Sequence, residues 1–142
     1  MNEERVTEAV EAHLTREGWT MFAVDYPTSG SGLRLHPADR ADGTKHGGSI
    51  VPDVVAYRER DVLVVESKPY FDVDDARKLR EVADGRYAES LDRRVYAVDI
   101  DRVYTALAFP ASDADAVRSD VLDGVDRLLL VDADGDVTER RV

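Results

Sequence analysis

The sequence contains no cysteine and only three lysines. The absence of cysteine excludes disulfides and thiolate zinc sites, which leaves oxygen-ligated metals as the inorganic partners to consider. No apolar run approaches the roughly 20 residues of a membrane span. The first twenty residues carry five glutamates and no basic segment followed by an apolar one, so they do not have the pattern of a secretory leader. We therefore expect a soluble, cytoplasmic protein with no membrane partner.

Positive charge is also scarce. Thirty acidic residues face nineteen basic ones, which gives a formal net charge of -11. Such a surface repels nucleic acid at low salt. However, the dominance of aspartate among the acids and of arginine among the bases resembles the composition of halophilic proteins. In molar salt the Debye length is about 3 Å, so long-range repulsion is screened. The acidity therefore indicates adaptation to salt first and argues only weakly against a DNA partner.

The length of 142 residues and the 43% share of hydrophobic residues fit one α/β domain with one core, spanning residues 1–142. Apolar residues at helical spacing predict a first helix over 3–17, ended by Gly18, and a second helix that begins after a cap at Asp72. A short helix is expected over 113–123. Strand-like runs occupy 19–25, 50–57, 62–67, 95–100, 103–109, 128–131 and 137–141, and the last two form a hairpin within 125–142.

Residues 28–50 form a long Gly- and Ser-rich loop, in which three basic residues face two acids. Long loops in compact domains are usually functional or disordered. The functional interpretation is contact with an anionic ligand, and the alternative is a surface excursion without a role. We expect DNA-binding residues in this loop and in the second predicted helix. For Lys78, in that helix, the alternative is a surface lysine without a role. The candidates are Arg34, Arg40, Lys45, His46 and Lys78.

The segment 52–68, PDVVAYRERDVLVVESK, places charged residues at both ends of a predicted hairpin. A turn centred on Glu59 and Arg60 pairs Asp53 with Glu66, and Lys68 then lies on the same sheet face. Opposed carboxylates destabilise a sheet unless something neutralises them, and a divalent cation such as magnesium does so. Lys68 is suited to orient or deprotonate an attacking water and to balance developing negative charge.

Pro52-Asp53, a gap of twelve residues and then Glu66-Ser67-Lys68 resembles the signature of the PD-(D/E)XK nuclease superfamily. The resemblance implies a restriction-endonuclease-like fold, a mixed β-sheet flanked by helices. It also implies metal-dependent hydrolysis of DNA with Asp53, Glu66 and Lys68 as catalytic residues. The cofactor is then Mg²⁺, for which Mn²⁺ substitutes, with Asp53 and Glu66 as ligands. The motif covers seventeen residues, and the order of predicted elements is similar over about residues 3–109.

One position departs from the superfamily pattern. Many members carry another glutamate on the first helix, and the matching position here is Thr7. Glu3, Glu8 and Glu11 are the nearby alternatives. We select Glu11 as a further metal ligand because we expect it to lie nearer the sheet end of the helix. A solvated helix face is the competing explanation for these acids.

Two classes of function follow. The first is a magnesium-dependent endodeoxyribonuclease, of restriction type or similar to repair enzymes and resolvases, which would act as a homodimer if it cuts both strands. The second is a non-catalytic nuclease-fold relative that binds DNA or a protein. For Asp53, Glu66 and Lys68, an ion-paired sheet end in an unrelated protein is the alternative without function.

Overall fold

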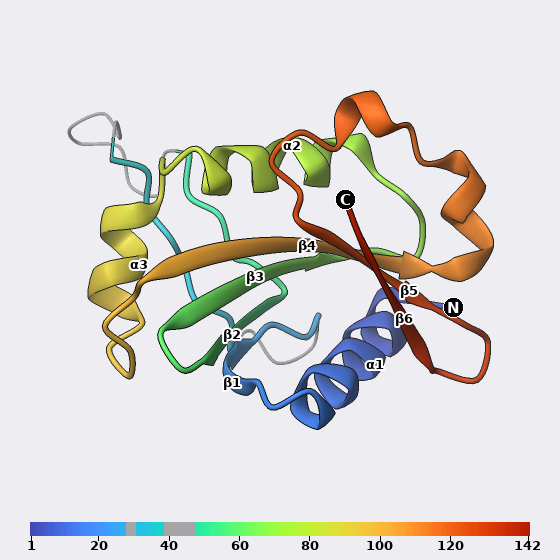
Figure 1. The fold of residues 1–142 in the computed structure, drawn as a ribbon, viewed down its shortest axis with the longest axis horizontal. Helices are drawn as coiled ribbons and strands as arrows, with labels where there is room; N and C mark the ends of the chain where they lie inside the picture. Colours follow the sequence, from blue (N-terminus) through green and yellow to red (C-terminus); the bar gives the residue numbers. More distant parts are fainter. Residues whose placement is uncertain (28–30, 39–47) are drawn as a thin grey trace.

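Six strands form one mixed sheet in the computed structural model, which describes residues 1–27, 31–38 and 48–142 (Figure 1). The spatial order follows the chain, β1-β2-β3-β4-β5-β6. The first three strands are antiparallel, β3, β4 and β5 are parallel, and β6 returns antiparallel to β5. The strands are β1 (Thr20–Val24), β2 (Val54–Arg58), β3 (Asp61–Ser67), β4 (Arg102–Pro110), β5 (Arg127–Val131) and β6 (Val137–Arg141).

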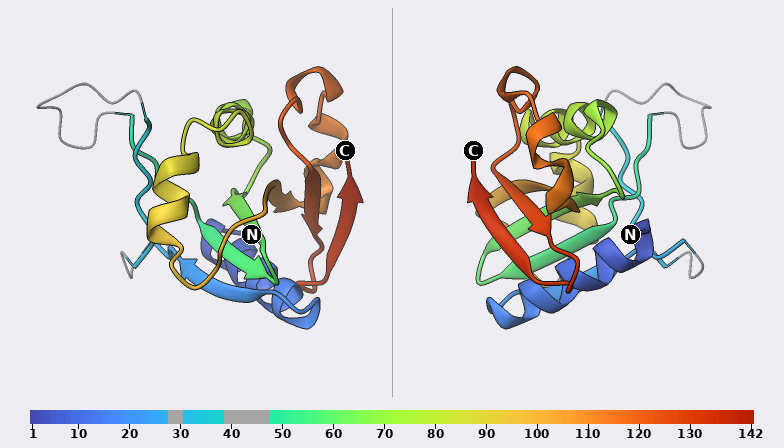
Figure 2. Two further views of the ribbon diagram at one scale, coloured as in Figure 1. Left: turned by 60° about the vertical axis from the view of Figure 1, so that its left-hand side comes forward. Right: turned by 90° about the vertical axis from the view of Figure 1, so that its right-hand side faces the viewer.

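Helices cover both faces of this sheet, as Figure 2 shows. Helix α1 (Glu3–Arg16) packs its apolar side on one face, while α2 (Val73–Ala83) and α3 (Ala88–Arg94) cover the other. Two short 3-10 helices, η1 (Ala111–Ala116) and η2 (Ser119–Val121), connect β4 to β5. The side chain of Asp72 accepts a hydrogen bond from the Asp74 N–H and caps α2, as predicted.

The β2–β3 hairpin has the predicted register. Val54 pairs with Val65 and Tyr57 with Val62, around a two-residue turn in which Glu59 has a positive φ of 57°. Continuing this register by one position places Asp53 opposite Glu66, immediately before β2 begins. We had expected residues 50–53 to belong to this strand, but β2 begins only at Val54. Ile50 makes an isolated bridge to Leu35, and Pro52 has no N–H to offer to a sheet.

Two other predicted elements are corrected. Residues 95–100 do not form a strand. They directly precede β4, whose two edges are occupied by β3 and β5, so no edge of β4 is left for another strand. Residues 113–123 form parts of two 3-10 helices instead of one α-helix, since Val117 and Arg118 are extended. The aspartates in this segment also favour local turns over a regular helix.

The protein is thus a single-domain α/β structure, a six-stranded mixed sheet flanked by helices, consistent with the restriction-endonuclease-like fold. Within the described residues, every helix is too short or too polar to cross a bilayer.

Candidate active site

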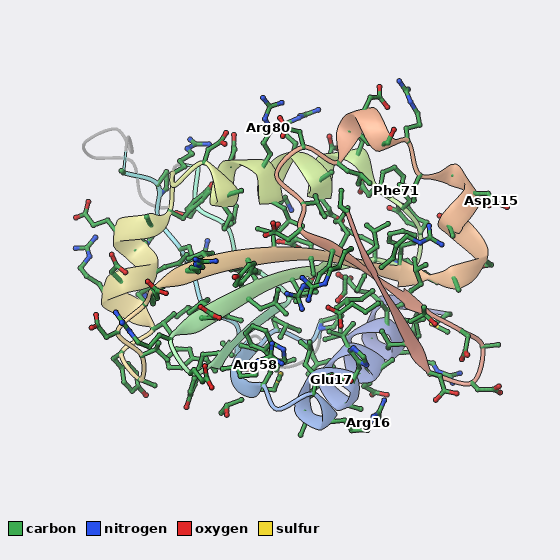
Figure 3. The ribbon with its side chains drawn as sticks, viewed as in Figure 1. Arg16, Glu17, Arg58, Phe71, Arg80 and Asp115 are labelled. Atoms are coloured by element: carbon green, nitrogen blue, oxygen red, sulfur yellow. The ribbon has the colours of Figure 1, made fainter. Side chains whose placement is uncertain are left out.

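The charged residues of the motif gather where β3 ends and β2 begins. Because these strands are antiparallel, the start of β2 lies beside the end of β3, which brings Asp53 next to Glu66 and Ser67. Alternate residues of the hairpin face the side of the sheet that α2 covers. By this alternation the face carries Asp53, Val55, Val62, Val64 and Glu66. Phe71, labelled in Figure 3, lies on the segment that leads from β3 into α2, and its ring contacts that of Phe109 edge to face.

Asp53 and Glu66 form a buried carboxyl pair. The two residues are only 8% and 4% exposed, and the hairpin register places them opposite each other. The N–H of Ser67 donates to Asp53 Oδ2 at 2.7 Å. Burial raises the pKa of Asp53, although its interactions with Glu66 and with the Ser67 N–H oppose this shift. Burial, followed by the charge of Asp53, raises the pKa of Glu66 well above its ordinary value.

Lys68 follows two residues after Glu66 and is partly exposed. Burial lowers the pKa of its ammonium, but the carboxylates of Asp75, Glu3 and Asp72 raise it more, and the net shift is upward. Lys68 is therefore a cation at neutral pH. An ammonium held in this form can stabilise negative charge, whereas it is a poor base for taking a proton from water.

The helix acid that meets this pair is Glu3. Burial, followed by the charge of Asp53, raises the pKa of its carboxyl group. Glu11 lies eight residues further along α1, about 12 Å along the helix axis. Its carboxylate accepts a hydrogen bond from the Tyr26 hydroxyl. Thr7, the position that matches the superfamily pattern, is buried and donates its hydroxyl to the carbonyl of Glu3.

Chain direction explains why Glu3 and not Glu11 lies at the pair. Helix α1 is followed directly by β1, which runs back along it, and β1 is antiparallel to β2. The N-terminus of α1 therefore lies at the same end of the sheet as the start of β2. We had assumed that the C-terminal part of the helix was closer. The reversed direction was readable from the predicted order helix, turn, strand, hairpin.

Asp75 is a second acid that we did not select. It lies in the first turn of α2, is 1% exposed, and its Oδ2 has no hydrogen-bond partner. Lys78, a predicted DNA contact, approaches Asp75 Oδ1 at 3.7 Å with a side chain that is 46% exposed. The sequence did carry a signal for the burial of Asp75. The helical spacing of the apolar residues Ala76 and Leu79 places Asp75 at the edge of the buried side of the helix.

The predicted loop contacts are only partly described. Arg40, Lys45 and His46 lie outside the described residues. Arg34 lies in the described segment 31–38, beside the bridge between Leu35 and Ile50, and is partly exposed. The structure therefore brings together Asp53, Glu66 and Lys68 with Lys78 nearby.

The donor set fits a hard divalent cation. Within the described residues, no group of three or more His, Asp or Glu side chains is placed to hold a metal. The converging acids are the pair Asp53 and Glu66, whose burial and mutual repulsion a cation would relieve. Magnesium commonly uses one or two carboxylates and keeps several waters, so a pair suffices.

A cleft of about 500 Å³ adjoins this site at the ends of β3, β4 and β5. Pro69, next to Lys68, lines it together with Arg5 of α1 and Ser112 of η1. Ligands of open α/β sheets bind outside the carboxyl ends of the strands, which is where this cleft lies. Arg5 is a cation that lines the cleft, and nothing in the sequence was a reason to select it.

Comparison with known proteins gives limited information about identity. No protein-family model matches the sequence, and no curated protein matches it. A crystal structure of an XisH family protein from Nostoc punctiforme PCC 73102 is similar over 94% of this chain and 96% of that one. The TM-score is 0.47 and the sequence identity is 18%. This likeness concerns the fold alone.

Proposed function

We propose that this protein is a metal-dependent endodeoxyribonuclease that hydrolyses phosphodiester bonds. The observation that carries the proposal is the buried carboxyl pair of Asp53 and Glu66, with the Lys68 ammonium close enough to lower the pKa of Asp53. These are the residues of the PD-(D/E)XK signature, and they converge at one end of the sheet beside a cleft. A pair of buried acids lowers the stability of a fold, so its presence favours a functional role.

Asp53 and Glu66 are the residues that would hold Mg²⁺, with Mn²⁺ as a substitute. When bound, the metal lowers the pKa of a coordinated water and offsets charge on the phosphate. The Ser67 N–H fixes the orientation of the Asp53 carboxylate. Glu3 lies close enough to Asp53 for their charges to interact, and it is the helix acid best placed to support Asp53.

Lys68 supplies positive charge for the scissile phosphate. Its ammonium stays protonated among acids, so it stabilises the negative charge that develops on the phosphate during attack. Lys78 and Arg5 are further cations near the same end of the sheet. They are suited to contact phosphates on either side of the cleaved bond. Cleavage of both strands would require two copies of this small domain, which favours a homodimer.

A specific observation favours a second candidate, a non-catalytic relative that binds DNA or a protein. Within the part of the chain that is described, no third carboxylate completes a metal-binding group with Asp53 and Glu66. The net charge of -11 also opposes DNA binding at low salt. In this candidate the acid pair survives as a structural remnant.

The test is cleavage of supercoiled plasmid, linear duplex and branched DNA in molar potassium chloride, with Mg²⁺, Mn²⁺ or chelator. The variants are Asp53→Asn and Lys68→Ala, and the matched exposed controls are Asp99→Asn and Arg77→Ala. We expect metal-dependent cutting of at least one DNA form that falls by about 10²–10³-fold or more in both site variants, the range typical for loss of electrostatic stabilisation. The controls should cut like the wild type.

Two results would contradict the proposal. Equal cutting by Lys68→Ala and wild type would remove Lys68 from catalysis. No cutting by folded wild type, together with no Mn²⁺ binding in calorimetry that depends on Asp53 and Glu66, would favour the non-catalytic candidate.

A further inference from the structure

Asp75 is a buried acid whose charge the fold does not satisfy. Two buried side-chain atoms in the described residues lack a hydrogen-bond partner, Ser67 Oγ and Asp75 Oδ2. Both belong to the segments that form the candidate active site. An unpaired oxygen of a buried carboxylate costs free energy, and native proteins seldom retain one without a reason. The position of Asp75 therefore requires an explanation beyond packing.

Stabilisation of the start of α2 does not supply that explanation. An acid in the first helical turn interacts favourably with the helix dipole, and more strongly when it is partly buried. Asp74, one residue earlier in the same turn, already provides such an acid; its side chain is 72% exposed and pairs with Arg77 at 3.3 Å. The dipole favours a negative charge at Asp75, but it gives the buried Oδ2 no hydrogen-bond partner.

The cations around Asp75 give a better explanation. Lys78 approaches its Oδ1 at 3.7 Å, and Lys68 is the cation with the largest influence on its carboxyl group. Conversely, Asp75 is the acid that most raises the pKa of Lys68. Two of the three lysines in the chain therefore lie near one buried carboxylate. Lys78 also lowers the pKa of Glu66 and Lys68 lowers that of Asp53, so each lysine acts both on Asp75 and on one acid of the pair.

We propose that Asp75 is a positioning residue whose carboxylate anchors both lysines beside the pair of Asp53 and Glu66. Oδ1 holds Lys78, and the unpartnered Oδ2 receives the ammonium of Lys68 when the site binds its anionic substrate. This inference rests on the proposed nuclease function and deepens it. It assigns to α2 the task of fixing two cations where the phosphate would bind.

The proposal predicts that stability and activity change in opposite directions. Asparagine has the shape of aspartate but no charge, so Asp75→Asn removes the uncompensated burial of a carboxylate. Its unfolding midpoint should rise above that of the wild type, whereas the loss of a structural residue would lower it. With the lysines released, kcat should fall at least about tenfold and KM change less than about threefold, since orientation matters most in the transition state.

Asp74→Asn is the matched control, because it removes the neighbouring charge from the same helical turn. It should leave kcat and the unfolding midpoint close to the wild-type values. Unchanged kcat in Asp75→Asn would overturn the proposal. So would a lower unfolding midpoint or failure of this variant to fold, since either result would make Asp75 a structural residue.

A second measurement separates this inference from the nuclease proposal. Because the chain has only three lysines, ¹³C-dimethylation gives three lysine methyl signals that single substitutions can assign. Asp75→Asn should shift and narrow the signals of Lys68 and Lys78 in the presence of inorganic phosphate, and Asp74→Asn should leave both in place. If the wild type cuts no DNA but these signals respond as stated, the nuclease proposal fails and the anchoring role stands. If the signals do not move, the anchoring role is wrong whether or not the protein cuts DNA.

Discussion

Two groups of buried charges in this protein are treated in opposite ways. Beneath the C-terminal hairpin of β5 and β6, Arg127 pairs with Glu139 at 2.6 Å, and the other oxygen of Glu139 lies 3.4 Å from His13. The guanidinium also lies near the rings of Trp19 and Tyr104. Each charge there has a partner of opposite sign or an aromatic face. This group stabilises the packing of the hairpin and of α1 on the sheet.

The group at the end of β3 is not balanced in this way. Burial raises the pKa of Asp53 and of Glu66, neither acid forms an ion pair within the described residues, and Asp75 has an oxygen without a hydrogen-bond partner. Arg127 and His13 are buried like the acids at the end of β3, whereas the side chain of Glu139 is 25% exposed. The difference lies in neutralisation. The hairpin group is complete within the fold, whereas the group at the end of β3 retains negative charge that an external cation would neutralise.

The largest expected effect comes from Glu66→Gln. The variant keeps the shape of the side chain but removes a ligand charge, so DNA cleavage should fall about 10³-fold or more. The unfolding midpoint should rise, because a desolvated acid with a raised pKa opposes folding at neutral pH. Glu89→Gln, on an exposed pair with Arg93, is the control. A lower midpoint in Glu66→Gln would place this acid with the structural charges and break the comparison.

The next effect concerns the hairpin group. Arg127→Ala should lower the free energy of unfolding by about 3 kcal/mol, since it leaves Glu139 without its ion-pair partner and removes packing against Trp19. Denaturant titration measures this change. Arg118→Ala is a sharp control, because Arg118 pairs with Asp120 at the same 2.6 Å but both side chains are more than half exposed. Its effect should stay below about 1 kcal/mol, and equal losses in the two variants would show that burial is irrelevant to the hairpin group.

A smaller effect is expected at the two acids of α1. Glu3→Gln should reduce cleavage and Mn²⁺ affinity by about tenfold, a size typical for residues that support metal ligands. Glu11→Gln should change each by less than about twofold, because Glu11 bonds to Tyr26 and lies about two turns away. The reverse order of effects would restore Glu11 as the helix acid of the site.

The smallest effect is a dependence of stability on pH. Burial raises the pKa of Asp75 from 3.8 to about 6, against the opposing charges of Lys68 and Lys78. The penalty for its charge is therefore fully present above about pH 6, decreases as the pH falls, and disappears below the unfolded value near 3.8. Thermal unfolding of wild type and Asp75→Asn should differ at pH 7 and converge at pH 3.5. A constant difference across this range would contradict the raised pKa.

The sequence by itself determined the local features of the site. The turn at Glu59 and Arg60 determined the hairpin register, and the alternation of strand side chains then placed Asp53 and Glu66 on one face. Asp72 was recognisable as a helix cap from its residue type and position. Each of these features depends on residues close together in the chain, where backbone geometry allows few alternatives.

Only the tertiary structure decided which distant residues join the site. The direction of α1 followed from the order of the elements, but the structure decided that the Glu3 carboxyl comes close enough to Asp53 for their charges to interact, and it buried Asp75 beside two lysines. It also excluded residues 95–100 from the sheet, because both edges of β4 were already paired. The physical reason is the same in all three cases. Burial and pairing depend on how helices and strands far apart in sequence compete for the same space, and local propensity carries no information about that competition.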